Sequence, residues 1–166
     1  LLQHVLGTAL SLQSKQAKNG PVVVVGHGAA DVKIFLANAS KENLSFGKVV
    51  TALQAEQKGT GHALLQALPK LDAQEPTLVL YGDVPLTTKK TLAKLAKLAD
   101  GVRGQDCALA LLTQSLSNPT GYGRIVRDAD GSVKEIVEEK DATPAQKAIQ
   151  EINTGIMVLP TNSLKK

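Results

Sequence analysis

A repeated pattern of short apolar runs constrains this fold most strongly. Each run ends in a polar or glycine-bearing turn, and a segment with helical periodicity follows the turn. Val22–Val25 is followed by the Gly-His-Gly turn of residues 26–28 and then by a helical pattern. Residues 48–53 and 76–80 precede turns and helical patterns in the same order. Strands that alternate with helices are typical of an α/β domain with a parallel sheet. We therefore expect a Rossmann-like α/β fold in which the run near residue 79 is a buried parallel strand.

The later part of the chain shows a different pattern. A turn-rich segment precedes a short run at residues 124–127, and Asp130-Gly131 predicts a hairpin to a partner strand at 133–137. The second half is therefore expected to be mixed or antiparallel within the same single domain. Further strands are predicted at residues 107–113 and 151–159. Helices are predicted at residues 1–18, 61–71, 92–99 and near 144–149, and another begins near Ala30 and runs for about ten residues.

Composition limits the classes of function. Hydrophobic residues make up 43% of the chain and aromatic residues 2%, which indicates a globular core of Val, Leu, Ile and Ala. The net charge of +4 favours anionic partners, but the lysines are scattered along one predicted helix, at Lys89, Lys90, Lys94 and Lys97. A solvated helix face is therefore favoured over a nucleic-acid interface. No apolar run is long enough to cross a bilayer.

The single cysteine excludes an intramolecular disulfide and fits a reducing compartment. Cys107 lies in a predicted strand, where a small core residue is favoured over a nucleophile. No secretory pattern opens the chain, and a cytoplasmic location is expected. The chain begins in a helical pattern without methionine and ends just after a possible helix cap at residues 161–163. We therefore expect it to be part of a longer protein.

Two turns contain residues suited to binding nucleotides. The segment from Gln54 to His62 joins a strand end to a helix start, where free backbone N–H groups suit an anion or the carbonyl and imide groups of a base. An alternative is that Thr60 only caps the helix. No Walker-type phosphate loop is present, and His27 is interpreted as a turn residue rather than a base. Asp83 suits a hard cation such as Mg²⁺, the alternative being a carboxylate that caps the turn.

Seven segments together resemble one domain of the bacterial bifunctional GlmU family. It is the uridylyltransferase domain, which acts as an N-acetylglucosamine-1-phosphate uridyltransferase. They occur in the family's order and spacing over essentially the whole chain: LLQHVL (1–6), VVVVGHG (22–28), QAEQKGTGHA (54–63), YGDVPL (81–86), NPTGYGRI (118–125), IVEEKDA (136–142) and EINTGI (151–156). The resemblance implies a three-layer nucleotidyltransferase fold and a Mg²⁺-dependent reaction. UTP and N-acetylglucosamine 1-phosphate would give UDP-N-acetylglucosamine, a precursor for peptidoglycan and lipopolysaccharide, and pyrophosphate.

The resemblance also implies roles for individual residues. Those matched to uracil binding are Gln54, Gly59 and Thr60, and those matched to the nucleotide and sugar are Tyr81, Gly82 and Asp83. Asp83 would be the magnesium ligand. Those matched to the N-acetylglucosamine unit are Gly123, Glu138 and Asn153.

Some parts of the family pattern are not among the residues given. They are the first strand with its glycine-rich triphosphate loop, a second metal ligand (an asparagine), and the acetyltransferase domain through which the family forms trimers. We therefore expect an exposed sheet edge and a chain that is weak or inactive as a catalyst by itself. A non-catalytic module that binds UDP-sugars, and a pyrophosphorylase for another sugar 1-phosphate, remain alternatives.

Overall fold

The computed structural model describes residues 1–13, 20–101 and 109–165. The helices are α1 (Leu2–Leu12), α2 (Ala29–Glu42), α3 (Thr60–Ala67), α4 (Lys89–Gly101) and α5 (Pro144–Lys147), with 3₁₀ turns η1 (Leu44–Lys48), η2 (Leu68–Lys70) and η3 (Thr161–Lys165). The strands are β1 (Val22–Val25), β2 (Val50–Leu53), β3 (Pro76–Val79), β4 (Ala110–Ser115), β5 (Arg124–Arg127), β6 (Val133–Val137) and β7 (Glu151–Pro160). The part of the first predicted helix beyond residue 13, and Cys107, lie outside the described residues.

The parallel part of the fold is the pair β1 and β2. Val22 pairs with Val50 and Val25 with Leu53, so both strands end at the same edge. One core cluster joins α1, α2 and η1 to this pair through the buried side chains of Leu6, Leu36, Ala39 and Phe46, with Val23 and Val49 packed against them. The helix α3 also packs against β1. The first strand–turn–helix units are therefore confirmed.

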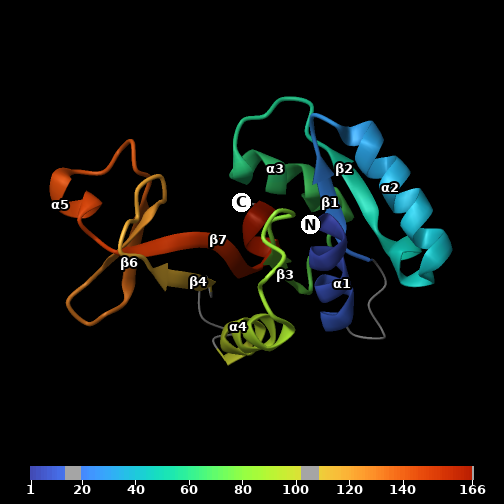
Figure 1. Ribbon diagram of the computed structural model, residues 1–166. Coiled ribbons are helices and arrows are strands. Elements are labelled where there is room, and N and C mark those ends of the chain that lie inside the picture. The colour runs from blue at the N-terminus through green and yellow to red at the C-terminus, as the bar shows by residue number, and fades with distance from the viewer. Residues whose placement is uncertain (14–19, 102–108, 166) are drawn as a thin grey trace.

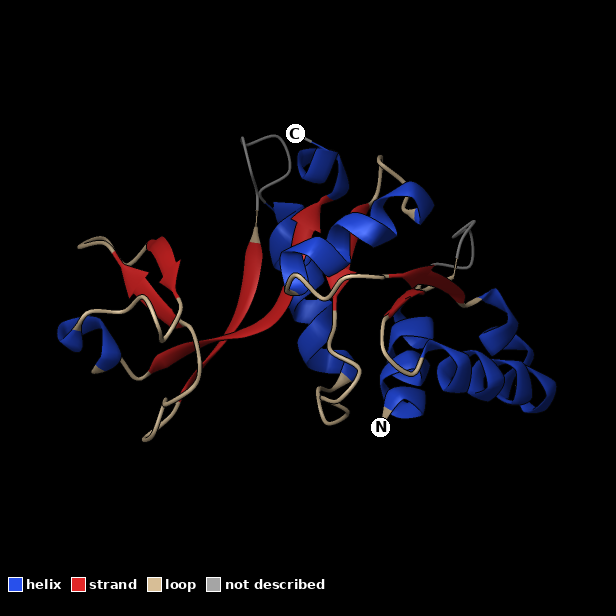
Figure 2. Ribbon diagram, turned by 90° about the horizontal axis from the view of Figure 1, so that it is seen from above, coloured by secondary structure: helices blue, strands red, loops and turns tan. Residues whose placement is uncertain are grey.

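The long strand β7 is the centre of the antiparallel sheet. Its residue Val158 pairs with Leu78 of β3 and with Ala110 of β4, which places those two strands on opposite edges. Nearer its start, Ile152 pairs with both Gln114 of β4 and Arg124 of β5. The β5–β6 hairpin and α5 thus extend from one end of β7, far from α2 (Figure 1). Figure 2 shows the same elongated arrangement from above.

The helix α4 covers one face of this sheet. Leu92, Leu95 and Ala99 are buried against Ile156 and Val158 of β7. The lysines on the other side of α4 are exposed, as expected for a solvated face. None of the helices in the described part of the chain has the length and apolar character needed to span a bilayer.

One prediction about the sheet is wrong. The run near residue 79 was expected to form a buried parallel strand, but β3 pairs antiparallel with β7, ends at Val79 and is at most half-buried. Within the described residues, β1 pairs only with β2 and β3 only with β7, so each has one edge without a partner strand. The apolar run predicted a strand correctly, but which strand lies beside it depends on contacts distant in sequence.

Candidate functional site

Gln54 lies where β1 and β2 end. Its backbone N–H donates to the carbonyl of Val25 at 2.8 Å, which continues the strand pairing by one residue. A surface cleft of about 510 Å³ opens here, lined by Gly26, His27, Leu53, Gln54, Ala55 and Gln57. A side chain at Gly26 would begin only 3.1 Å from Nε2 of Gln57, so glycine keeps this part of the cleft open. The carboxyl ends of parallel strands are the usual ligand-binding edge of such folds.

The Gln54 side chain is held by the turn that follows it. Its Nε2 donates to the carbonyl of Gly59 at 3.1 Å and lies 3.0 Å from Nδ1 of His62. Oε1 of Gln54 has no hydrogen bond to another described residue. The half-buried amide is therefore fixed while its oxygen remains available to a ligand.

The start of α3 differs from the alternative in which Thr60 caps the helix. The cap is Gly59, with φ +91° and no side-chain cap, and Thr60 is the first helical residue. Gly59 is favoured there because residues with a Cβ rarely adopt positive φ. The first N–H groups of the helix have no intrahelical partner and face outward near Gln54. The uracil-site prediction is thus compatible with this geometry.

Tyr81, Gly82 and Asp83 form a turn after β3, in which the N–H of Val84 donates to the carbonyl of Tyr81 at 3.3 Å. The half-buried ring of Tyr81 packs directly over Gly155 of β7, while Gly82 and Asp83 are exposed. A Cβ at Gly155 would lie 2.4 Å from Cε2 of Tyr81. The carboxylate of Asp83 is therefore presented to solvent beside a ring that is held against β7.

The three residues matched to the sugar lie in one row across neighbouring strands. Arg124 pairs with Val137 and with Ile152, so one residue earlier Gly123 lies between Glu138 and Asn153. The N–H of Asn153 donates to the carbonyl of Gly123 at 2.8 Å. A Cβ at Gly123 would be 3.4 Å from Oε1 of Glu138. Gly123 is buried, and its lack of a Cβ lets the carboxylate of Glu138 lie close to the backbone, on the face of the sheet that Asn153 shares.

The polar groups left free in this row differ in kind. Oδ1 of Asn153 accepts from the N–H of Gly155 at 2.9 Å, which leaves the Nδ2 hydrogens without a partner among the described residues. The exposed carboxylate of Glu138 likewise forms no hydrogen bond to another described side chain. The row therefore offers amide donors on one side of Gly123 and carboxylate acceptors on the other.

A buried arginine, which no sequence pattern indicated, holds the loop around Gly123. Arg124 is 1% exposed. Its guanidinium donates to Glu139 Oε2 at 2.7 Å and to the carbonyls of Tyr122 and Lys147. The N–H of Gly121 also donates to this carboxylate. The hydrogen bonds from Arg124 and Gly121 hold the pKa of Glu139 below its ordinary value. The adjacent acidic pair Glu138-Glu139 was the only signal in the sequence, and it did not indicate which member faces inward.

The structure brings some predicted residues together and leaves others apart. Tyr81, Gly123, Glu138 and Asn153 are connected through Gly155 and the strand row. Gln54, Gly59 and Thr60 form a second group at the end of β2. No hydrogen bond or ion pair between described residues joins the two groups, so a ligand would have to connect them.

Asp83 could hold only part of a metal site. Among the described residues, no group of three or more His, Cys, Asp or Glu side chains is close enough to enclose a metal ion. Mg²⁺ does not require such a cage, since it commonly binds one or two carboxylates together with substrate phosphates and water. An exposed carboxylate at Asp83 fits that mode of binding.

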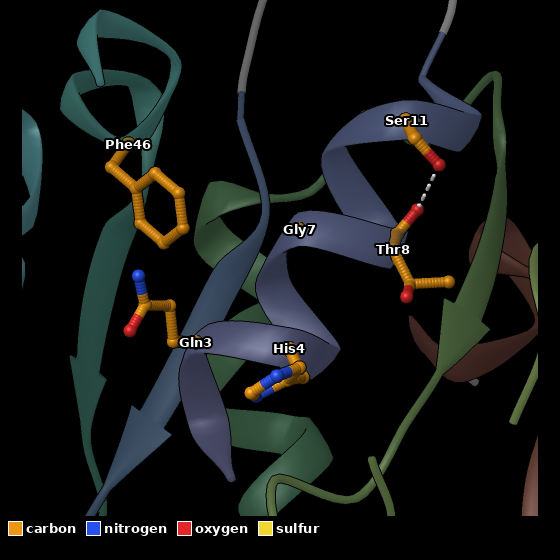
Figure 3. A pocket seen from close by; sticks show the side chains of 6 residues that line it. All are labelled: Gln3, His4, Gly7, Thr8, Ser11 and Phe46. Atoms are coloured by element: carbon orange, nitrogen blue, oxygen red, sulfur yellow. Dashed lines mark hydrogen bonds between the residues drawn. The ribbon is translucent and has the colours of Figure 1, made fainter. Parts of the chain in front are cut away.

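A second hollow has none of the predicted site residues in its lining. It has a volume of about 500 Å³ and is lined by one side of α1 and by Phe46 of η1 (Figure 3). Ser11 Oγ already donates to the carbonyl of Thr8 at 2.8 Å, and the surrounding side chains contribute no charged cluster. This hollow carries no catalytic residue type in a reactive arrangement.

Comparison with known proteins agrees with the resemblance found in the sequence. The chain is 53% identical to the bifunctional protein GlmU of Cupriavidus taiwanensis over 166 residues, which covers 100% of this chain and 33% of that protein. It is 53% identical over 164 residues to the protein of the same name from Burkholderia multivorans, covering 99% and 32%. The chain thus spans about a third of the length of the curated relatives that it matches.

Solved structures and a family model support the fold. Apo UDP-glucose pyrophosphorylase matches with a TM-score of 0.70 at 16% identity, over 99% of this chain and 66% of that one. Its complex with UDP-glucose gives 0.69 at 15% identity, over 99% and 65%. At such low identity these structures confirm the α/β nucleotidyltransferase fold alone. The family model described as nucleotidyl transferase matches residues 9–166, and the chain therefore belongs to the nucleotidyl transferase family.

Proposed function

We propose that this chain forms the uridine and sugar sites of an enzyme that makes UDP-N-acetylglucosamine. The substrates would be UTP and N-acetylglucosamine 1-phosphate, and the second product pyrophosphate. The observation that carries the proposal is the row of Glu138, Gly123 and Asn153, in which a carboxylate and a side-chain amide without other partners among the described residues lie on neighbouring strands. Family membership and the similarity to GlmU proteins support nucleotidyl transfer as the reaction.

The row suits an N-acetylated sugar because of which atoms remain free. Oδ1 of Asn153 is already used by Gly155, so Asn153 would donate from Nδ2 to the acetyl carbonyl. The carboxylate of Glu138 would accept hydrogen bonds from sugar hydroxyl groups. A Cβ at Gly123 would come within 3.4 Å of Oε1 of Glu138, so glycine here would leave that carboxylate in place for the sugar.

The chemical step needs no general base. A phosphate oxygen of the sugar 1-phosphate, already anionic at neutral pH, attacks the α-phosphorus of UTP. The bond from that phosphorus to its bridging oxygen breaks, and pyrophosphate leaves with the electron pair. The protein would mainly position two polyanions, with Gln54 and the start of α3 holding the base. Mg²⁺, held by Asp83 and phosphate oxygens, would neutralise developing negative charge.

Two further expectations concern assembly and location. Assembly as a homotrimer through an acetyltransferase domain, and a cytoplasmic location, stay predictions. A rival function is a module that binds UDP-sugars without turnover, and another is a pyrophosphorylase for a different sugar.

Asp83→Ala discriminates between enzyme and binding module. Pyrophosphate release from UTP and N-acetylglucosamine 1-phosphate should be lost in the variant, while uridine nucleotide binding is largely retained. Asp128→Ala is a matched control, because Asp128 is an exposed carboxylate at the β5–β6 turn, away from both residue groups. Turnover by Asp83→Ala equal to the weak turnover expected of the unsubstituted chain would refute the metal role. An unsubstituted chain that binds UDP-sugars but shows no turnover at all would favour the binding module.

Asn153→Asp tests the sugar assignment. The variant keeps an oxygen for the N–H of Gly155 but loses the amide donor. The preference for UDP-N-acetylglucosamine over UDP-glucose, measured by calorimetry, should fall about tenfold, because a carboxylate faces the acetyl carbonyl. Affinity for UDP itself should change little. An unchanged preference would instead support another sugar as the substrate.

A further inference from the structure

The orientation of the Gln54 amide is set by chemistry at the start of α3. The carbonyl of Gly59 can only accept a hydrogen bond, so the Gln54 atom 3.1 Å from it must be Nε2. The reverse orientation would place two oxygens against each other. One Nε2 hydrogen is therefore committed to Gly59, and the other lies toward Nδ1 of His62 at 3.0 Å.

This contact also assigns the tautomer of His62. Nδ1 must be unprotonated to accept from Gln54, so the neutral ring carries its proton on Nε2. That nitrogen lies 3.2 Å from the Gln66 amide, which can rotate to present its oxygen. Such rotation gives up the 3.3 Å bond from Gln66 to the carbonyl of His62, an acceptor already used within the helix, and turns an amide oxygen toward that carbonyl. The carbonyl of Gly59 also accepts from the N–H of Ala63 at 3.1 Å, so it too would keep a donor if Gln54 rotated. Rotation of Gln54 would, however, bring two oxygens to 3.1 Å rather than to 3.3 Å, so the conflict is resolved at Gln66, whose contact is the longer one.

We propose that His62 is a positioning residue that locks the Gln54 amide with its oxygen toward the base, and so makes the site select uracil over cytosine. The inference rests on the proposed uridine site. With both hydrogens of Nε2 committed, Oε1 can receive only a donor. Uracil presents the N3–H donor between two carbonyl acceptors. Cytosine presents an unprotonated N3, which would be repelled by the same oxygen.

The experiment measures binding of UMP and CMP to the full chain by calorimetry. His62→Ala frees one Gln54 hydrogen and lets the amide rotate, and His62→Asn retains an acceptor near the position of Nδ1. We expect the ratio of UMP to CMP affinity to fall about tenfold in His62→Ala and to be largely restored in His62→Asn. His4→Ala, a substitution of an exposed histidine on α1, should leave the ratio unchanged.

A purely structural role of His62 would weaken both nucleotides equally, and an unchanged ratio in His62→Ala would therefore overturn the inference. An unsubstituted chain that binds both nucleotides equally would overturn it too, while leaving the sugar assignment to be judged by Asn153→Asp. If neither nucleotide binds, the proposed function fails as well.

A second readout does not depend on the variants folding. Nitrogen-15 shifts of the His62 ring should show Nδ1 unprotonated and Nε2 protonated in the unsubstituted protein at neutral pH. Protonation of Nδ1 instead would overturn the inference, because the Gln54 amide would then lose its acceptor.

Discussion

Replacing Gly155 by alanine would test how Tyr81 is positioned over β7. Gly155 has φ +75° and lies in an irregularity of β7, where residues 154–156 face the single residue Leu112 of β4. A Cβ there would lie 2.4 Å from Cε2, 2.6 Å from the hydroxyl oxygen and 2.7 Å from Cζ of Tyr81. Alanine therefore meets both an unfavourable backbone conformation and a ring that has to move.

The two costs can be estimated separately. Positive φ costs a residue with a Cβ about 1–2 kcal/mol, and overpacking of a well-packed site costs about 1–3 kcal/mol. Gly155→Ala should thus lower the free energy of unfolding by about 2–5 kcal/mol, a large part of the total for a domain of this size. Gly131→Ala is a matched control, since φ is +85° there but nothing lies within 4 Å of the added Cβ. It should cost only the backbone part.

The assay is urea unfolding followed by far-ultraviolet circular dichroism. If Tyr81 is the obstacle, the extra cost of Gly155→Ala over Gly131→Ala should disappear in a Tyr81→Ala background. Equal costs for the two glycine variants in the unsubstituted background would refute the close packing of Tyr81 on β7. An extra cost that persists without the Tyr81 ring would assign it to the strand irregularity instead.

Two ion pairs lead to further predictions. Arg124→Met should lower the free energy of unfolding by about 2–4 kcal/mol, because buried carbonyl contacts of the guanidinium are lost. The same change should raise the pKa of Glu139 toward its ordinary value, and an unchanged carboxyl titration by NMR would contradict the assignment. Arg127 lowers the pKa of Glu151 from 4.5 to about 2 through its hydrogen bond, so this pair stabilises the fold above pH 4.5 and loses that effect as the pH falls toward 2. Glu151→Gln should flatten the dependence of unfolding free energy on pH in that window, and an unaltered slope there would argue against the pair.

Local patterns in the sequence were sufficient to predict most elements. Four consecutive valines before a glycine form β1, and Asp130-Gly131 turns the β5–β6 hairpin. The spacing of Leu92, Leu95 and Ala99 placed them together on the buried side of α4. These features depend on side-chain periodicity and on backbone conformations that residues close in sequence decide among themselves.

Pairing between distant segments could not be predicted in the same way. An apolar run such as residues 78–80 is compatible with parallel or antiparallel neighbours, and only the docking of β7 made β3 antiparallel. The burial of Arg124 and the exposure of Glu138 likewise depend on which face of the hairpin meets α5 and the loop after β6. Neighbouring acids in a sequence carry no information about that choice.

The family and the proposed binding residues could be assigned from the seven short segments, because their ordered set is specific before any folding is considered. Tertiary structure decided how these residues can act. It aligned Glu138, Gly123 and Asn153 across three strands, seated Tyr81 on Gly155, and oriented the amide of Gln54 between Gly59 and His62. The physical reason is that strand register and hydrogen-bond direction arise from pairing between distant segments, which no local pattern encodes.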